Sequence, residues 1–136
     1  MYKFINIILI LFVLTIFGCK YSHSEMIEQS IGIHIDKDSY EVIDFHEEWC
    51  PNGDGEYYLK IHIVRNNAEV LKAILSKSPK PLPVDDSVPC RFIDSASSEL
   101  RKGYYLYMQD EKDSRDYALF IYDINSNNAY LCIEYY

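Results

Sequence analysis

The sequence predicts an α+β fold, an antiparallel sheet of about five strands with one principal helix packed on one face. Short runs rich in aliphatic and aromatic residues recur along the chain and are separated by turn-forming residues, as in a sheet protein. The chain contains 13 tyrosines, many beside aliphatic residues, and tyrosine favours strands. An exposed aromatic sheet face that binds a sugar or a protein is a second explanation of these tyrosines. Residues 25–136 are expected to form a single domain.

The first elements of the domain are a short helix and a hairpin. Residues 25–30 are predicted to be helical, with Ser24 as N-cap and Gly32 ending the helix. Strands are expected at 40–46 and 57–64, because the second places Leu59, Ile61 and Ile63 on one face and Tyr58, Lys60 and His62 on the other. The turn formers at 51–55 predict a hairpin between them.

The principal helix is expected at 68–77, after Asn66 and Asn67. Its apolar residues fall on one stripe, formed by Val70, Leu71, Ile74 and Leu75. Four prolines then predict an extended loop over 78–91, because proline is excluded from helix interiors and central strands. The last third is predicted to be a meander of strands at 103–108, 117–124 and 129–136.

The N-terminus has the pattern of an export signal. Lys3 precedes an apolar run, Phe4–Phe17, which is shorter than the roughly 20 residues that a membrane-spanning helix needs. The following residues, Ile16-Phe17-Gly18-Cys19, resemble the lipobox of bacterial lipoproteins, although Phe17 is bulkier than the residue usual there. An ordinary secretory signal with a chance cysteine, or an uncleaved anchor, are the other interpretations.

The lipoprotein resemblance implies an anchor and a location. Residues 1–18 would be the signal peptide, Cys19 the lipidated first residue of the mature protein, and residues 19–24 the tether. Several acyl chains would hold the domain at the membrane stably. Lys20 stands where an aspartate would suggest retention at the inner membrane, so the resemblance implies the bacterial cell envelope, and the outer membrane rather than the inner.

The charge of the domain limits its partners. Without Lys3 there are 12 basic and 21 acidic side chains, a formal net charge of −9. Nucleic acids and anionic lipid surfaces attract clustered Lys and Arg, and the sequence has no such cluster. It therefore argues against nucleic acid and permits a basic protein partner.

Three cysteines follow Cys19. Cys50 and Cys90 lie next to prolines in expected loops, whereas Cys132 lies in an expected strand. We expect a Cys50–Cys90 disulfide, which would close a loop of about 40 residues and contribute about 3–4 kcal/mol in the chain-entropy model. Cys132 is expected to be a small buried side chain. The alternative is that all three are reduced or merely buried.

Potential ligands for a metal gather in residues 44–56. The segment holds one histidine, one cysteine and several carboxylates, and the candidate ligands are His46, Glu48, Asp54 and Glu56. The spacing lacks the second histidine of a zinc-protease helix and the alternating acids of an EF-hand. A solvated hairpin loop explains the same residues, and no cofactor is predicted. The run from His46 to the Gly53-Asp54-Gly55-Glu56 step also resembles uncharacterised small exported bacterial proteins, with Glu47, Glu48 and Trp49 in place of glycines; this implies no activity.

Three functions remain open. The sequence contains no Gly-x-Ser-x-Gly elbow and no phosphate-binding glycine loop, so we expect no enzyme. The favoured interpretation is a non-enzymatic binding module at the envelope, of an inhibitor or immunity type, that engages a protein partner. A metal- or small-ligand-binding protein that uses residues 44–56 is the first alternative, and a structural envelope component is the second.

Overall fold

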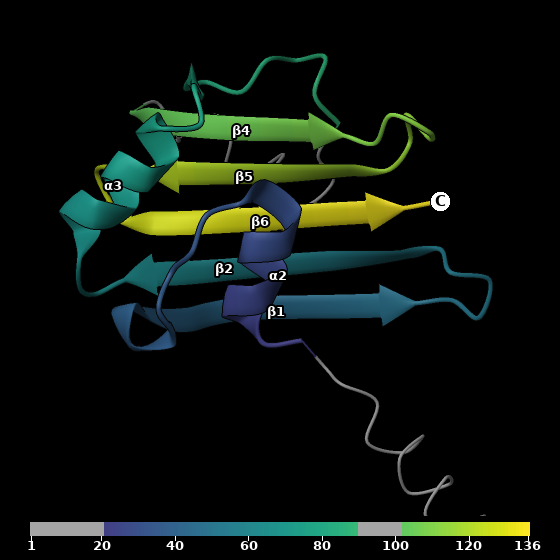
Figure 1. The fold of residues 1–136 in the computed structure, drawn as a ribbon, viewed down its shortest axis with the longest axis horizontal. Helices are drawn as coiled ribbons and strands as arrows, with labels where there is room; N and C mark the ends of the chain where they lie inside the picture. The colour runs from purple at the N-terminus through teal and green to yellow at the C-terminus, as the bar shows by residue number, and fades with distance from the viewer. Residues whose placement is uncertain (1–20, 90–101) are drawn as a thin grey trace, which may run out of the picture.

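The computed structural model describes residues 21–89 and 102–136. They form a six-stranded antiparallel sheet in the order β1-β2-β6-β5-β4-β3, and both helices lie on one face of it (Figure 1). The helices are α2 (His23–Ile31) and α3 (Asn67–Leu75), with a short 3₁₀ helix, η1 (Lys37–Ser39). The strands are β1 (Tyr40–Trp49), β2 (Gly55–Ile63), β3 (Lys80–Pro81), β4 (Gly103–Gln109), β5 (Tyr117–Asp123) and β6 (Asn128–Tyr135).

The α+β class is confirmed, with two differences in the number of elements. The sheet has six strands instead of five, because Lys80 and Pro81 of the expected proline loop pair with β4 as β3. Proline is tolerated there because β3 is an edge strand. The prediction of one principal helix was wrong, since α2 and α3 each have nine residues.

Helix α2 begins earlier than predicted. Ser22, not Ser24, is the N-cap: its hydroxyl accepts from the Glu25 N–H, and the Glu25 carboxylate accepts from the Ser22 N–H at 2.7 Å. This is a capping box, which satisfies two backbone donors at once. Ser24 is buried and shares a hydrogen bond of 2.9 Å with the Tyr40 hydroxyl. Gly32 ends the helix in the left-handed conformation, as expected.

Helix α3 lies close to its predicted place. Val70 and Ile74 of the expected apolar stripe are buried, whereas Leu75 at the helix end is 46% exposed. Asn66 precedes the helix in the left-handed conformation and donates to the Ser39 hydroxyl instead of capping α3. The helix ends at Leu75, before the predicted Lys77.

Strand β1 is longer than expected, and this matters for the site. It continues through Trp49, so of the segment 44–56, for which a solvated loop was one interpretation, residues 44–49 lie in β1 and 55–56 in β2. The connection to β2 contains only residues 50–54. The hairpin is confirmed: β1 pairs antiparallel with β2, with Phe45 opposite Leu59 and Trp49 opposite Gly55. A register shift between Val42 and Asp44 interrupts the ladder.

The two faces of the sheet carry separate apolar clusters. Ile27 and Ile31 of α2 and Ile74 of α3 pack on one face against alternate residues of the central strands. The expected distribution of the β2 side chains between the two faces is confirmed, because Leu59, Ile61 and Ile63 belong to this helix-side cluster. On the opposite face, Leu82 packs with strand residues; most are tyrosines, and the full buried set is Tyr58, Leu82, Tyr105, Tyr117, Leu119, Ile121, Tyr130 and Cys132.

Most of the described tyrosines lie in strands. The side chains of Tyr21, Tyr135 and Tyr136 are exposed, by 55%, 40% and 44%. The last three long strands form the expected meander, β4-β5-β6. Strand β6 also pairs with β2, which joins the meander to the hairpin in one sheet.

Several expectations concern residues outside the described ranges. The signal peptide, Cys19 and Cys90 lie there. Cys50 has an exposed side chain, and Cys132 is fully buried, as predicted. Among the helices of the described residues, none has the length and apolarity needed to cross a membrane.

Candidate functional site

Strand β1 presents different side chains to the two faces of the sheet. Successive residues of a strand point to opposite faces, so Phe45, Glu47 and Trp49 lie on the helix side while His46 and Glu48 lie on the other. The turn end of the β1–β2 hairpin therefore carries two candidate sites, one on each face.

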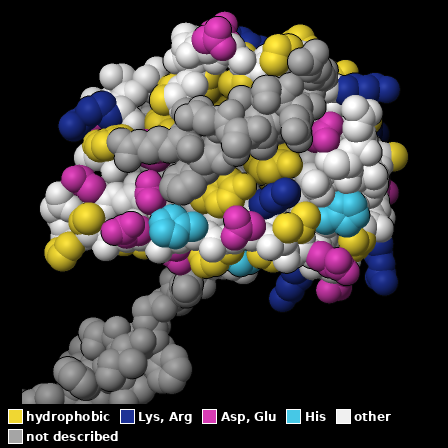
Figure 2. Space-filling model, turned by 180° about the vertical axis from the view of Figure 1, so that it is seen from behind, with side chains coloured by type: hydrophobic (Ala, Val, Ile, Leu, Met, Phe, Trp, Pro, Cys, Tyr) yellow, Lys and Arg dark blue, Asp and Glu magenta, His cyan; other side chains and the backbone are white. Residues whose placement is uncertain are grey.

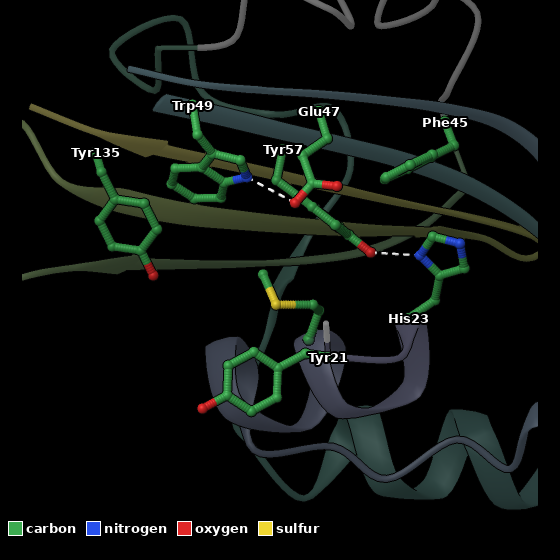
Figure 3. A pocket seen from close by; sticks show the side chains of 8 residues that line it. Tyr21, His23, Phe45, Glu47, Trp49, Tyr57 and Tyr135 are labelled. Atoms are coloured by element: carbon green, nitrogen blue, oxygen red, sulfur yellow. Dashed lines mark hydrogen bonds between the residues drawn. The ribbon is translucent and has the colours of Figure 1, made fainter. Parts of the chain in front are cut away.

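The helix-side site is a pocket between the start of α2 and the ends of β1, β2 and β6 (Figure 3). Its volume is about 320 Å³, at the low end of ligand pockets. Most of the lining is aromatic, and we call it the aromatic pocket: Tyr21, His23, Met26, Phe45, Glu47, Trp49, Tyr57 and Tyr135. Tyr57 is only 2% exposed, whereas Trp49 is 44% exposed, so the pocket has a buried floor and an accessible rim.

Two hydrogen bonds orient the polar groups of the aromatic pocket. Trp49 Nε1 donates to Glu47 Oε1 at 2.6 Å, and the Tyr57 hydroxyl and His23 Nδ1 share a hydrogen bond of 2.5 Å (Figure 3). Burial, with a smaller contribution from the Glu47 charge, raises the pKa of Tyr57 well above its usual range. Tyr57 is therefore a neutral hydroxyl at physiological pH, and Glu47 is the acidic residue of the lining.

The rings of the pocket pack against one another. Phe45 meets His23 and Tyr57 edge to face, with centroid separations of 4.7 and 5.3 Å. The Trp49 ring lies 5.6 Å from that of Tyr135. Such contacts stabilise aromatic pairs beyond their buried area, so they support the walls of the pocket.

Gly55 gives Trp49 the space that it occupies. A Cβ atom on Gly55 would lie 2.2 Å from Trp49 Cε3 and 2.6 Å from the Glu48 carbonyl oxygen. Because no side chain stands at this position opposite Trp49 in the hairpin, the indole can lie across the sheet toward Tyr135. The glycine therefore shapes one wall of the aromatic pocket.

The opposite face carries a row of three carboxylates. Glu48 on β1 pairs with Glu56 on β2, which pairs with Glu134 on β6. His46 Nε2 lies 3.2 Å from Glu56 Oε1 and 3.9 Å from Glu48 Oε2. Figure 2 shows acidic side chains beside a histidine on this face. Like charges opposite one another destabilise a sheet, so this row favours the binding of a cation.

Glu134 is the buried member of the row. It is 5% exposed, and its Oε2 accepts a hydrogen bond of 2.7 Å from the Tyr136 hydroxyl. Within the described residues its Oε1 has no hydrogen-bond partner. The nearby Glu134 carboxylate also contributes, after burial and Cys132, to a raised pKa of Tyr117.

The structure brings together three of the four predicted metal ligands. One ligand atom from each of His46, Glu48 and Glu56 lies within 4.8 Å of the others, and this is the arrangement that could hold a metal ion. Asp54 is not in the group: its Oδ2 accepts from Asn52 Nδ2 at 2.8 Å within the turn. Asp54 lies apart from the group because residues 50–54 form the turn, where side chains no longer alternate between the two faces of the sheet.

Sequence reasoning missed most of the aromatic pocket. Tyr21 and His23 were assigned to a polar tether, and Tyr135 is the last residue of a different strand, β6. Glu134 was likewise missed as a neighbour of Glu56. The alternation Phe45-x-Glu47-x-Trp49 indicates that these three share a face, but the predicted strand ended at His46.

The outer edge of β1 is the third feature of this region. β1 is the last strand of the sheet on its side. It exposes four large apolar side chains, Val42, Ile43, Phe45 and Trp49, with exposed fractions from 36% to 50%. An edge strand offers unpaired backbone groups to another strand, and β1 adds exposed apolar side chains to this edge.

Comparison with known proteins gives no further constraint, since no family model, curated protein or solved structure matches the chain.

Proposed function

We propose that the protein is a non-enzymatic binding module of the bacterial cell envelope, which engages a protein partner through strand β1, as an inhibitor or immunity-type protein would. The observation that carries this proposal is the exposed edge of β1 with its four apolar side chains. An exposed sheet edge can accept an extended segment of another protein as an added strand.

The regular part of the edge limits where a partner strand pairs. The ladder with β2 is continuous from Asp44 to Trp49 but is interrupted before Asp44. Interruptions of this kind impede pairing. The added strand is therefore expected along 44–49.

The charge of β1 defines the partner's chemistry. The strand carries Glu41, Asp44, Glu47 and Glu48 and has no Lys or Arg. Complementary charges accelerate association and suppress wrong partners. The occupant is therefore an extended, basic segment of a protein.

Charge reversal tests this surface. The full chain is compared with a Glu41→Lys/Glu48→Lys variant and with an Asp86→Lys/Glu111→Lys control, which has the same net charge but changes exposed residues away from β1. Each is immobilised and exposed to envelope extracts and culture supernatant. We expect a partner that the first variant loses and the control retains, and backbone hydrogen exchange of residues 44–49 that slows in the complex. Equal retention by both variants, or no slowing at 44–49, would contradict the proposal.

The lipid anchor is a separate part of the proposal. We infer acylation at Cys19 and attachment to the outer membrane from the lipobox resemblance. Cys19→Ser should release the protein from the membrane fraction, and density-gradient fractionation should place the unsubstituted protein with outer-membrane markers. A Cys19→Ser variant that stays in the membrane fraction contradicts the anchor without affecting the edge-strand proposal.

A second candidate function is metal binding, favoured by the group formed by His46, Glu48 and Glu56. Imidazole nitrogen with carboxylate oxygen suits Zn²⁺ or Mn²⁺. The full chain, stripped with a chelator, is titrated with each metal by calorimetry. Binding should be lost in His46→Ala/Glu56→Gln and kept in Glu47→Gln, because Glu47 lies on the helix side. Absence of binding to the unsubstituted chain, or equal binding by both variants, rules out this function.

A further inference from the structure

We propose that the aromatic pocket is a binding site for an organic ammonium group. This inference goes beyond the partner at the β1 edge, because it concerns side chains on the helix face and needs no added strand. It depends on three properties of the pocket: aromatic walls, a negative charge held in place, and access from solvent.

The walls have the composition that ammonium groups bind. Tyr21, Trp49 and Tyr135 are 55%, 44% and 40% exposed, and each lines the pocket. Aromatic ring faces attract cations, and sets of such rings recognise quaternary ammonium groups. Methionine adds a polarizable surface, here Met26.

The charge of the pocket selects a cation. Glu47 is a lining carboxylate, and its Oε1 is oriented by the indole N–H of Trp49 at 2.6 Å. Among the described residues, the eight that line the pocket include no Lys or Arg. Figure 3 shows the Glu47 carboxylate between the rings of Trp49 and Phe45, facing the cavity. An anionic ligand would therefore be repelled by this carboxylate, and an ammonium group would be attracted to it.

The size and openness of the pocket fit a compact group. A volume of about 320 Å³ accommodates a small ligand or the end of a long side chain. The buried Tyr57, whose hydroxyl is bonded to His23, forms an ordered floor. Two sources can supply the same chemistry: a small free ammonium compound and a lysine side chain of a protein.

Tryptophan fluorescence reports directly on this pocket, because Trp49 is the single tryptophan of the chain. The full chain in non-ionic detergent is titrated with two ammonium compounds, choline and Nα-acetyl-lysine methylamide, whose side-chain amine is free. A third titration uses 3,3-dimethylbutanol, the neutral analogue of choline in which carbon replaces nitrogen. Calorimetry of the same titrations detects binding that leaves the emission unchanged. We expect saturable binding of at least one ammonium compound and at least about tenfold weaker binding of the neutral analogue.

Two neighbouring carboxylates provide the matched variants. Glu47→Gln should weaken ammonium binding by at least about tenfold, whereas Glu48→Gln, on the opposite face, should leave it unchanged. If Glu47→Gln disturbs the fold, Trp49→Phe tests the aromatic pocket by calorimetry. This variant should weaken ammonium binding while thermal unfolding stays cooperative.

The outcomes separate the sources and the proposals. Saturation by choline supports a small free ligand, and saturation only by the lysine derivative supports a protein side chain. The proposal is overturned if neither ammonium compound binds, if dimethylbutanol binds equally well, or if both Glu47→Gln and Trp49→Phe bind as the unsubstituted chain does. None of these results depends on whether a partner pairs with β1.

Discussion

Strands β5 and β1 belong to the same sheet but have opposite environments. All seven residues of β5 are buried, while no residue of β1 is fully buried. β5 lies between β4 and β6, with apolar clusters on both of its faces, and β1 lies at the edge. Apolar burial is therefore concentrated at the centre of the sheet, and the edge strand contributes much less of it.

The difference follows from composition. β5 has one acidic residue, Asp123, at its end, whereas β1 has four acidic residues distributed along its length. Buried carboxylates require compensation, so a strand like β1 cannot occupy the centre. Asp123 shows the compensation: its carboxylate accepts from Ser126 Oγ at 2.6 Å and from the Asn125 N–H at 3.2 Å.

The largest expected difference is between two phenylalanines. Phe120 of β5 is 1% exposed and Phe45 of β1 is 36% exposed. Phe120→Ala should lower the free energy of unfolding by about 3–5 kcal/mol, because it leaves a cavity in the core. Phe45→Ala should cost about 1 kcal/mol. Urea unfolding of both variants measures the contrast, and equal losses would show that the edge is as important for stability as the centre.

Two glycines extend the comparison with a smaller effect. A Cβ on Gly103 of β4, where φ is +153°, would lie 1.9 Å from the Tyr122 carbonyl oxygen. Gly103→Ala should therefore destabilise the protein by about 2–3 kcal/mol. Gly55→Ala, at the turn end of β2 beside the edge strand, should cost about 1 kcal/mol and change the emission of Trp49, which must move. Unfolding curves and emission spectra distinguish the two; unchanged Trp49 emission in Gly55→Ala would contradict the packing described for the aromatic pocket.

The capping box of α2 predicts a moderate effect. Ser22→Ala removes the side-chain acceptor for the Glu25 N–H and should cost about 1 kcal/mol. Ser30→Ala is the matched control, because the Ser30 hydroxyl bonds only within the helix, to the Met26 carbonyl, and alanine favours helix. Thermal unfolding should show a larger loss of stability for Ser22→Ala than for Ser30→Ala. The reverse result would place the N-cap elsewhere.

The smallest expected effect concerns His34, which is exposed and lies between α2 and η1. A hydrogen bond from the imidazole to Glu28, then one to Asp36, raises the pKa of His34 above its ordinary value of 6.5. A raised folded pKa stabilises the fold at pH values below 6.5, and this contribution is lost as the pH rises through the folded pKa. Proton NMR of the His34 ring should give a pKa above 6.5 that falls in Glu28→Gln. An unchanged value in that variant would remove Glu28 as the cause.

Local sequence patterns predicted the elements better than their ends. The alternation in 57–64 placed β2 to within two residues, because period-2 burial is encoded in the strand itself. The N-cap of α2 was misplaced by two residues, although Ser22 and Glu25 have capping-box spacing. The end of β1 was missed because His46, Glu47 and Glu48 are polar, and an edge strand does not need apolar residues at every second position.

The candidate sites depend on pairings that the sequence does not contain. His46, Glu48 and Glu56 could be proposed together because they are close in the chain. Glu134 joins them only because β6 pairs with β2 in the observed register. Tyr21 and Tyr135 enter the aromatic pocket from opposite ends of the described chain, and no local pattern links them.

Residue types and their periodicity were enough to predict the α+β class and the five long strands. They do not specify which faces of these elements meet. The pairing of β2 with β6 and the packing of α2 over the hairpin end arise from long-range burial of apolar surface, which has no preferred direction along the chain. For this reason an aromatic pocket and a row of carboxylates lie on opposite sides of one hairpin.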